Sequence, residues 1–191
     1  MQRITDELEL AWFRIRDPGL EELLILGNSL RNDQIEEFVE ALSKKQRKYE
    51  REYLTRDEAE FREDAYDELR EVLEDYLGRL NTAQRQRVRE AAAQLHRSDD
   101  RWLAERAEWI AVMKLELNRD PGWERRIRYT IFNWEDQLDA DTLAIYEHNT
   151  QTVQAVIAEV VNSRSEKQDR RLRRKLNGLR EDLVLLVSQA D

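Results

Sequence analysis

The chain has no cysteine, only two prolines, five glycines and two histidines among its 191 residues. The absence of cysteine excludes disulfides, cysteine-ligated zinc and thiol nucleophiles together. It leaves the compartment open, because a reducing cytosol tolerates cysteine and an oxidising periplasm often disfavours an unpaired one. No uninterrupted apolar run approaches the roughly 18 residues that a membrane-spanning helix needs. No signal-peptide core follows Met1, so we expect either a cytosolic protein or a part of a longer chain.

Acidic residues outnumber basic ones by 41 to 32, which gives a formal net charge of -9 and a pI near 5.0. This balance disfavours a nucleic-acid partner, because phosphate binding draws on an excess of Lys and Arg. Disorder is not expected, since five Trp, six Tyr and many Leu can bury enough area to offset chain entropy. At this length one well-buried core is the default, so we predict a single domain over residues 1–191.

Apolar residues recur every three or four positions almost from end to end, which is the spacing of amphipathic helices. We predict an all-α fold with about nine such helices and no β-sheet. The first stripe is Ile4, Leu8, Trp12 and Ile15, and the last is Leu172, Leu176, Leu179, Leu183 and Leu186. The loops are short, so consecutive helices are expected to pack as elongated antiparallel hairpins.

Three short sequences have the pattern of a capping box, in which a small polar residue precedes Glu or Gln by three positions. They are Thr55–Glu58, Asn81–Gln84 and Ser165–Gln168. In this motif the two side chains accept hydrogen bonds from backbone N–H groups that a helix start leaves unpaired. Further helix boundaries are predicted at the Asp-Pro-Gly sequences 17–19 and 120–122 and at Gly27-Asn28.

Charge is distributed unevenly along the chain. Residues 56–79 carry ten acids and four bases, whereas residues 164–181 carry eight bases and three acids. Two solvated helix faces would give this pattern, and so would two helices that lie against each other or meet in an oligomer. We interpret the acids of the first segment, which include Asp64, Glu68 and Asp75, as a solvated face rather than a catalytic pair.

No catalytic motif is present in the sequence: it lacks a glycine-rich phosphate loop, a nucleophile elbow and a kinase signature. His96 and His148 each lack the preceding Glu that a ferritin-like di-iron bundle requires, and no His-Glu-x-x-His zinc motif occurs. We therefore predict a protein that is not an enzyme and has no cofactor and no metal. Each histidine is interpreted as a surface or helix-end residue.

The segment from Trp102 to Trp109 is the first candidate for a partner-binding surface. The two tryptophans lie two helical turns apart on one face, and Arg106 lies between them, close enough to stack on either ring. An aromatic core layer with an arginine that reaches solvent would explain this pattern. The alternative is an exposed patch that binds a partner, since Trp and Arg are common interface anchors. At least one of the two tryptophans is expected to be mostly buried.

Tyr146 and Asn149 are the second candidate for a surface that binds a protein partner. Asn149 is interpreted first as a buried amide that fixes helix register or bonds a loop carbonyl, with partner binding as the alternative. The sequence leaves the oligomeric state open.

Four segments resemble a proteobacterial family of predicted lipoproteins that is catalogued only as a domain of unknown function. They are Leu80–Arg85, Trp102–Arg106 with Trp109, Tyr146–Asn149, and Arg171–Leu176 followed by Leu179. The resemblance implies the soluble part of an envelope protein that faces the periplasm and is anchored in the outer membrane through a lipid-bearing cysteine. Because this chain has no cysteine, the anchor would belong to a segment absent from it. A cytoplasmic location is the alternative.

The element Leu80–Gln84, and more loosely Leu30–Gln34, is also similar to the Leu-Thr-x-x-Gln motifs of the periplasmic chaperones Spy and CpxP. Physically the element is a hydrophobic staple joined to a capping box. Two hypotheses follow for the function. The first is a non-enzymatic binding module or scaffold for a protein partner, and the second is a chaperone-like binder of unfolded envelope proteins.

Overall fold

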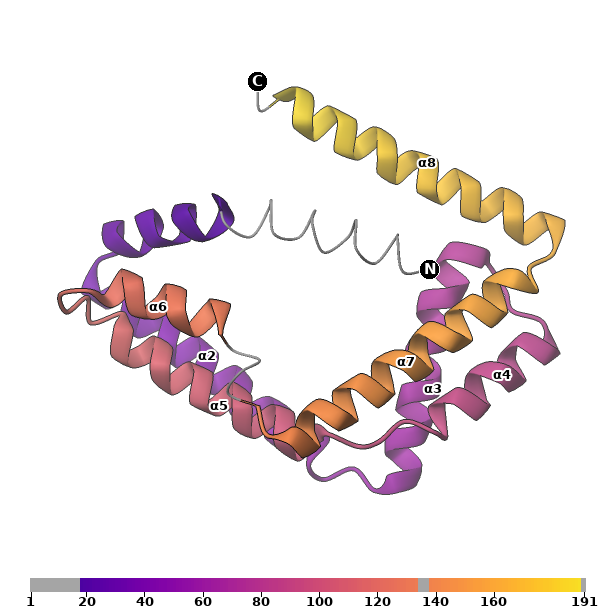
Figure 1. The fold of residues 1–191 in the computed structure, drawn as a ribbon, viewed down its shortest axis with the longest axis horizontal. Coiled ribbons are helices and arrows are strands. Elements are labelled where there is room, and N and C mark those ends of the chain that lie inside the picture. The colour runs from indigo at the N-terminus through magenta and orange to yellow at the C-terminus, as the bar shows by residue number, and fades with distance from the viewer. Residues whose placement is uncertain (1–17, 134–137, 190–191) are drawn as a thin grey trace. The chain divides into compact units, whose positions relative to one another are not determined.

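A computed structural model describes the backbone of residues 18–133 and 138–189, and the side chains up to residue 185. These residues form eight helices and no strand, so the predicted all-α fold is confirmed for the described part of the chain (Figure 1). The prediction of about nine helices included one at Ile4–Ile15, which lies outside the described residues. Asp17, which belongs to the first predicted boundary, also lies outside them.

The chain divides into two compact units, and each unit has its own buried core. Unit 1 comprises Met1–Thr55 and Asp99–Asp139, and unit 2 comprises Arg56–Ser98 and Ala140–Asp191. Each unit is therefore assembled from two separate stretches of sequence. The single domain over residues 1–191 stays a prediction.

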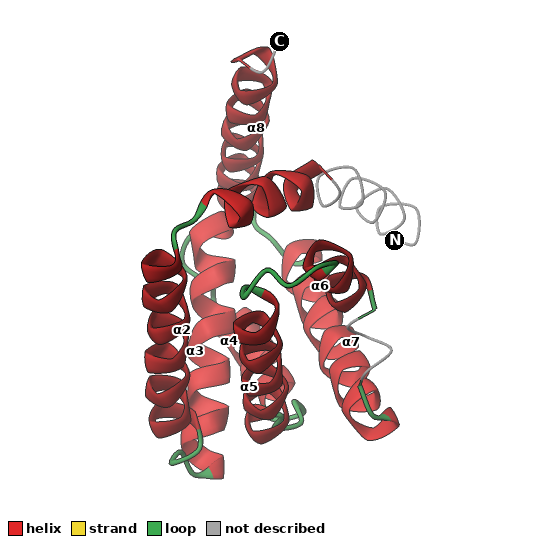
Figure 2. Ribbon diagram, turned by 90° about the vertical axis from the view of Figure 1, so that its left-hand side faces the viewer, coloured by secondary structure: helices red, strands yellow, loops and turns green. Residues whose placement is uncertain are grey.

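Unit 1 contains the helix over residues 18–29, α2 (Asn32–Tyr53), α5 (Asp99–Glu116) and α6 (Trp123–Phe132). α5 packs against both α2 and α6 (Figure 2). The buried core consists of Leu20, Leu24, Ile35, Met113, Leu117, Trp123 and Ile127. The core joins the start of α2 to the end of α5, so these two helices run antiparallel.

Gly27 lies inside the first helix of unit 1, which ends at residue 29, so the predicted boundary is correct to within one or two residues but the glycine does not end the helix. The indole of Trp123 packs on this glycine: a Cβ at position 27 would lie 2.9 Å from its Cη2 atom. Trp123 is itself buried, so the ring has little room to move. Glycine is present here because two helices approach closely, not because the chain turns.

The second Asp-Pro-Gly boundary is confirmed. α5 ends at Glu116 and α6 begins at Trp123, and Gly122 between them has a φ of 86°. That left-handed conformation favours glycine. Arg126 donates to the buried carboxylate of Glu116 at 2.6 Å, which pairs this charge and holds the two helix ends together.

Unit 2 contains α3 (Glu58–Leu77), α4 (Thr82–Ala92), α7 (Ala140–Asn162) and α8 (Glu166–Gln189). α3 and α4 form a hairpin, α7 packs on α4, and α8 packs on α3 (Figure 1). The expected pairing of consecutive helices thus holds for α3–α4 and α5–α6, whereas α7 and α8 diverge after their turn. The core consists of Tyr66, Leu73, Leu77, Leu80, Val88, Ala91, Ala92, Val156 and Val160.

The capping box predicted at Thr55–Glu58 is wrong, because α3 begins after Asp57. The Asp57 carboxylate accepts from the N–H groups of Ala59 and Glu60 at 2.8 and 2.9 Å, and the Glu60 carboxylate accepts from the Asp57 N–H at 2.9 Å. Thr55 instead donates to the Arg51 carbonyl at the end of α2. Thr55–Glu58 and Asp57–Glu60 both have the capping-box pattern. The carboxylate of Asp57 is favoured because it also interacts with the positive end of the helix dipole.

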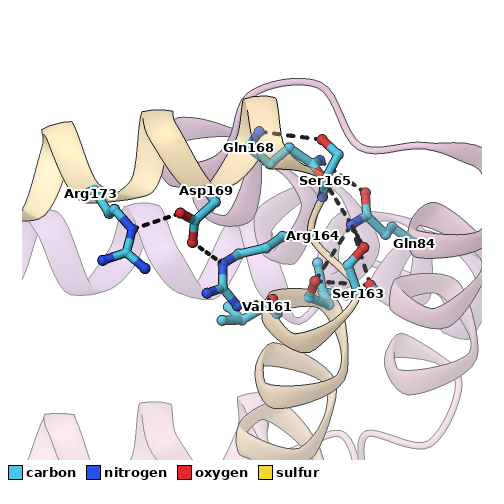
Figure 3. Close-up of polar contacts among 9 residues, drawn as sticks. Gln84, Val161, Ser163, Arg164, Ser165, Gln168, Asp169 and Arg173 are labelled. Carbon is cyan, nitrogen blue, oxygen red and sulfur yellow. Dashed lines mark hydrogen bonds and ion pairs between the residues drawn. The ribbon is translucent and has the colours of Figure 1, made fainter.

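The other two predicted capping boxes are confirmed. Asn81 accepts from the Gln84 N–H at 2.9 Å, and Gln84 accepts from the Asn81 N–H at 3.0 Å. Ser165 and Gln168 exchange the same pair of bonds at the start of α8, at 3.3 and 2.9 Å (Figure 3).

The structure joins these two capping boxes through their glutamines. The amides of Gln84 and Gln168 bond each other in both directions, with Nε2–Oε1 distances of 3.2 and 3.0 Å. Gln84 Nε2 also lies 3.5 and 3.4 Å from the carbonyl oxygens of Val160 and Ser163, and Gln168 Nε2 donates to the Arg79 carbonyl. Both side chains are buried, at 2% and 7% exposure. Amides are required here, because each side chain must accept and donate at once.

The basic helix α8 contacts the acidic helix α3 where α8 begins. Lys175 Nζ lies 2.7 Å from the Asp75 carboxylate, and Arg171 donates to the Asp75 carbonyl. Glu68 and Glu71 of α3 stay exposed. Both interpretations of the charge pattern therefore apply: the helices meet at one end, and other acids of α3 are exposed to solvent.

Asp169, in the first turn of α8, is held by two guanidinium groups. Arg173 Nε and Arg164 Nε lie 2.6 and 2.7 Å from its carboxylate oxygens (Figure 3). These hydrogen bonds, that from Arg173 foremost, lower the pKa of Asp169 from its ordinary value of 3.8. Because the pKa of Asp169 is lower in the folded chain than in the unfolded chain, its carboxylate stabilises the fold at pH values above its pKa in the unfolded chain. This stabilisation is lost as the pH falls through the pKa that Asp169 has in the folded chain.

We therefore expect Asp169→Asn to lower the urea midpoint of unfolding at about pH 6, and the difference from wild type to shrink below about pH 4. Circular dichroism across a pH series measures this difference. Glu166→Gln is the matched control, because Glu166 is exposed and lies 3.7 Å from Arg170, and it is expected to change little at any pH. A difference for Asp169→Asn that stayed constant down to about pH 2 would contradict the role of its charge.

Candidate protein-binding surface

Aromatic side chains from α2 and α5 meet on the surface of unit 1. The ring centroids of Tyr49 and Tyr53 are 5.6 Å apart, and the Trp102 ring lies 5.6 Å from the first and 5.9 Å from the second. Tyr49 and Tyr53 are one turn apart near the end of α2, and Trp102 is level with them because α5 runs antiparallel to α2. We call Tyr49, Tyr53, Trp102, Arg106 and Trp109 the aromatic patch.

Both tryptophans of the aromatic patch keep part of their surface in solvent, 38% for Trp102 and 37% for Trp109. Both residues are thus among the exposed large apolar residues, and the prediction that at least one is mostly buried is not confirmed. Complete burial of both would have excluded a role in partner binding. Their exposed edges leave that role open.

Arg106 stacks across the helix pair rather than along its own helix. Its guanidinium carbon lies 5.5 Å from the Tyr49 ring centroid, and Lys45 Nζ lies 5.8 Å from the same centroid. Among the described residues Arg106 forms no hydrogen bond or ion pair, and its Nε atom is buried without a partner. Its other nitrogens are therefore available to a partner's carboxylate or carbonyl oxygen.

A buried amide links the two helices beneath the aromatic patch. Gln46 Nε2 donates to the Leu103 carbonyl at 2.9 Å and to the Glu50 carboxylate at 3.0 Å. This bond fixes α2 and α5 in register, so the patch rests on a defined helix pair and not on a loop. Tyr49 and Tyr53 are four residues apart and therefore share one helix face, but sequence spacing does not bring them to Trp102. Only the antiparallel register of two distant helices does so.

Tyr146 and Asn149 belong to unit 2, on α7. Asn149 Oδ1 accepts from the His96 N–H and its Nδ2 donates to the His96 carbonyl, both at 2.8 Å. This is the loop-bonding role expected from the sequence, and it occupies the Asn149 amide within the chain, although the residue is only partly buried. Tyr146 is half-buried.

The two histidines of the chain stack on each other, with ring centroids 4.1 Å apart and planes inclined by 15°. His148 Nε2 lies 2.9 Å from the Gln94 carbonyl, so this nitrogen carries the hydrogen. Together with Asn149 they hold the segment after α4 against α7. No sequence motif links His96 to His148, and the pairing follows from the packing of α7 on α4.

A groove of about 360 Å³ lies between α4 and α7, beside His148. Small or apolar residues, including Ala91, Ala155 and Val156, line it together with Arg87, Glu90 and Glu159. Arg87 and Glu159 lie 3.7 Å apart, so charges of opposite sign pair there instead of converging on a ligand. In the described part of the chain no three His, Asp or Glu side chains gather as metal ligands. No described helix is both long and apolar enough to cross a membrane.

The chain belongs to the DUF6279 family, a family of unknown function that matches residues 1–143. The match includes Leu80–Arg85 and the whole aromatic patch. It ends before Tyr146–Asn149 and Arg171–Leu176. No curated protein and no solved structure matches the chain.

Proposed function

We propose that this protein is a non-enzymatic binding module or scaffold that holds a protein partner on the aromatic patch. The observation that carries the proposal is the partial exposure of Trp102 and Trp109 beside the available donors of Arg106. Tryptophan and arginine are frequent interface anchors, because they bury a large area and donate hydrogen bonds at fixed geometry.

The charges around the aromatic patch indicate the chemistry of the partner. Arg106 and Lys45 both lie over the Tyr49 ring, although the chain as a whole carries a net charge of -9. A partner that fits should therefore present an apolar side chain flanked by carboxylate or carbonyl oxygens.

A chaperone-like binder of unfolded envelope proteins is the second candidate. It is supported by large apolar side chains that are exposed on several helices of both units. They include Leu23, Ile25, Val72, Leu115, Tyr129 and Leu179. A dispersed apolar surface suits clients that bind without a fixed stoichiometry.

The variant Trp102→Ala/Trp109→Ala distinguishes these functions. We expect it to weaken binding of a dedicated partner by at least about 30-fold, corresponding to roughly 2 kcal/mol for loss of an aromatic anchor. The partner would be isolated from envelope extracts by crosslinking, and its affinity would be measured by titration with each variant. Tyr129→Ala, an exposed aromatic outside the patch, is the matched control and should bind like wild type.

The chaperone function is tested by light scattering, which measures the aggregation of a chemically denatured client with and without this protein. A dedicated binding module should not suppress aggregation of unrelated clients. Suppression across several clients that weakens in the Trp102→Ala/Trp109→Ala variant would favour the chaperone function instead. Equal partner binding by the double variant and by wild type would contradict a role of the aromatic patch.

We also propose, from the sequence resemblance alone, that the parent protein is a proteobacterial lipoprotein that faces the periplasm from the outer membrane. The full-length protein should then sediment with outer membranes and be released by detergent but not by salt. Recovery in the soluble cytoplasmic fraction would support the cytoplasmic alternative.

A further inference from the structure

The second half of α8 carries an apolar face that the described chain leaves largely uncovered. Leu172 packs on the core of unit 2. Leu176, Leu179 and Leu183, which follow it at steps of four, three and four residues, are 48%, 53% and 56% exposed. Figure 1 shows this half of α8 extending away from α7 and α4.

Such a helix half requires an apolar partner to be stable. A helix segment of this length is marginal in water, because packing supplies most helical stability. Gly178 lowers the helix propensity at its middle, and no heavy atom lies within 4 Å of a Cβ built there. The spacing of the four leucines is that of a coiled-coil seam, which is buried by a second helix with the same spacing.

We propose that the exposed part of the leucine seam of α8 (Leu176, Leu179 and Leu183) binds the same leucines of a second copy of this chain in antiparallel orientation. The charge gradient along α8 supports this occupant. Residues 167–175 carry six bases and one acid, whereas Glu181 and Asp182 follow near the other end. A parallel pair would place the bases of both copies side by side, and an antiparallel pair brings each acidic end to the other copy's basic end.

The positions that flank the leucine seam select the same orientation. Lys175 and Asp182 are one heptad apart on the same side of the seam, and Arg180 lies on the other side. A parallel coiled coil sets Lys175 against the second copy's Arg180, whereas an antiparallel one sets it against the second copy's Asp182. The ammonium of Lys175 has donors beyond its bond to Asp75, and its side chain is partly exposed.

One like-charge contact opposes the antiparallel pair. The antiparallel arrangement places Arg173 of each copy near Arg180 of the other. The charge of Arg173 is already compensated within its own helix, because its Nε lies 2.6 Å from the Asp169 carboxylate. The antiparallel pair therefore keeps the better balance of charges.

The association should be weak and reversible. A few half-exposed leucines on each copy bury less than the roughly 1,200 Å² at which specific stable interfaces begin. We therefore expect a dissociation constant on the order of 10–100 µM. This self-association goes beyond the binding of a partner at the aromatic patch and does not depend on it.

Analytical ultracentrifugation of the full chain from about 5 to 300 µM tests the proposal, because this range spans the expected dissociation constant. Wild type should pass from monomer to dimer, and Leu179→Glu/Leu183→Glu should stay monomeric. Leu115→Glu, which alters an exposed leucine of α5 in unit 1, is the matched control and should dimerise like wild type. Circular dichroism establishes that each variant is folded.

Disulfide crosslinking tests the orientation, and the absence of native cysteine removes any background. In an antiparallel pair each leucine faces a different leucine of the second copy. In the register that sets Lys175 against Asp182, Leu179 faces Leu176 of the second copy, so Leu179→Cys should crosslink with Leu176→Cys in a mixture and not with itself. Efficient self-crosslinking of Leu179→Cys would indicate a parallel pair and overturn the proposal.

Three further results would overturn it. One is a wild-type chain that remains monomeric throughout the concentration range. Another is a dimer that persists in Leu179→Glu/Leu183→Glu. The third is a monomer that floats with phosphatidylcholine–phosphatidylglycerol vesicles through these leucines, which would assign the face to a lipid surface.

Discussion

Gln84→Glu is expected to destabilise unit 2 by about 2–4 kcal/mol, and Gln168→Glu by a similar amount. Gln84 Nε2 is the donor shared by Gln168 Oε1 and by the carbonyl oxygens of Val160 and Ser163. A carboxylate there would turn an oxygen toward those acceptors, in a site that is only 2% exposed. The loss should become smaller at low pH, because protonation of the introduced carboxyl restores a donor.

Urea unfolding followed by circular dichroism measures this loss. Gln34→Glu is the matched control, since Gln34 occupies the equivalent position in α2 and its Oε1 accepts from the Arg31 N–H at 3.0 Å. A carboxylate fulfils that acceptor role equally well, so we expect a change within about 0.5 kcal/mol. Equal effects of the Gln34 and Gln84 substitutions would show that the paired amides contribute nothing beyond capping.

Leu80→Ala is expected to cost about 2–5 kcal/mol, the range for truncation of a buried leucine. Leu80 is 1% exposed and belongs to the core that α3, α4 and α7 share. The substitution keeps the backbone bond from the Leu80 N–H to Glu74 and removes only side-chain volume, so the loss reports packing. Val72→Ala changes an exposed side chain of α3 and is expected to shift stability by less than about 0.5 kcal/mol.

Two spectroscopic signals separate the effect of Leu80→Ala on the two units. The five tryptophans, at positions 12, 102, 109, 123 and 134, all fall within the sequence ranges of unit 1. Circular dichroism senses helices of both units, whereas tryptophan fluorescence senses unit 1. We expect the dichroism midpoint to fall further than the fluorescence midpoint, because the cavity forms in unit 2. An unchanged dichroism midpoint would contradict the assigned burial of Leu80.

The residues of the aromatic patch show how far a site can be predicted from sequence. Helical spacing placed Trp102, Arg106 and Trp109 on one face, because it depends only on residues within two turns. It did not predict that Arg106 stacks on Tyr49, since that contact depends on how α2 and α5 pack. Asn149 could bond within the chain or bind a partner, and the sequence did not distinguish these roles. Only the fold shows that its amide bonds the backbone of His96.

The sequence by itself determined the all-α class and most helix starts, because periodicity and capping are local rules that act over three or four residues. Where two local solutions compete, as at Thr55 and Asp57, the same rules failed. Tertiary structure alone decided the division into two units and the pairing of Gln84 with Gln168, 84 residues away. Such contacts depend on which helix faces meet, and an amphipathic pattern states that a face is apolar without specifying its partner.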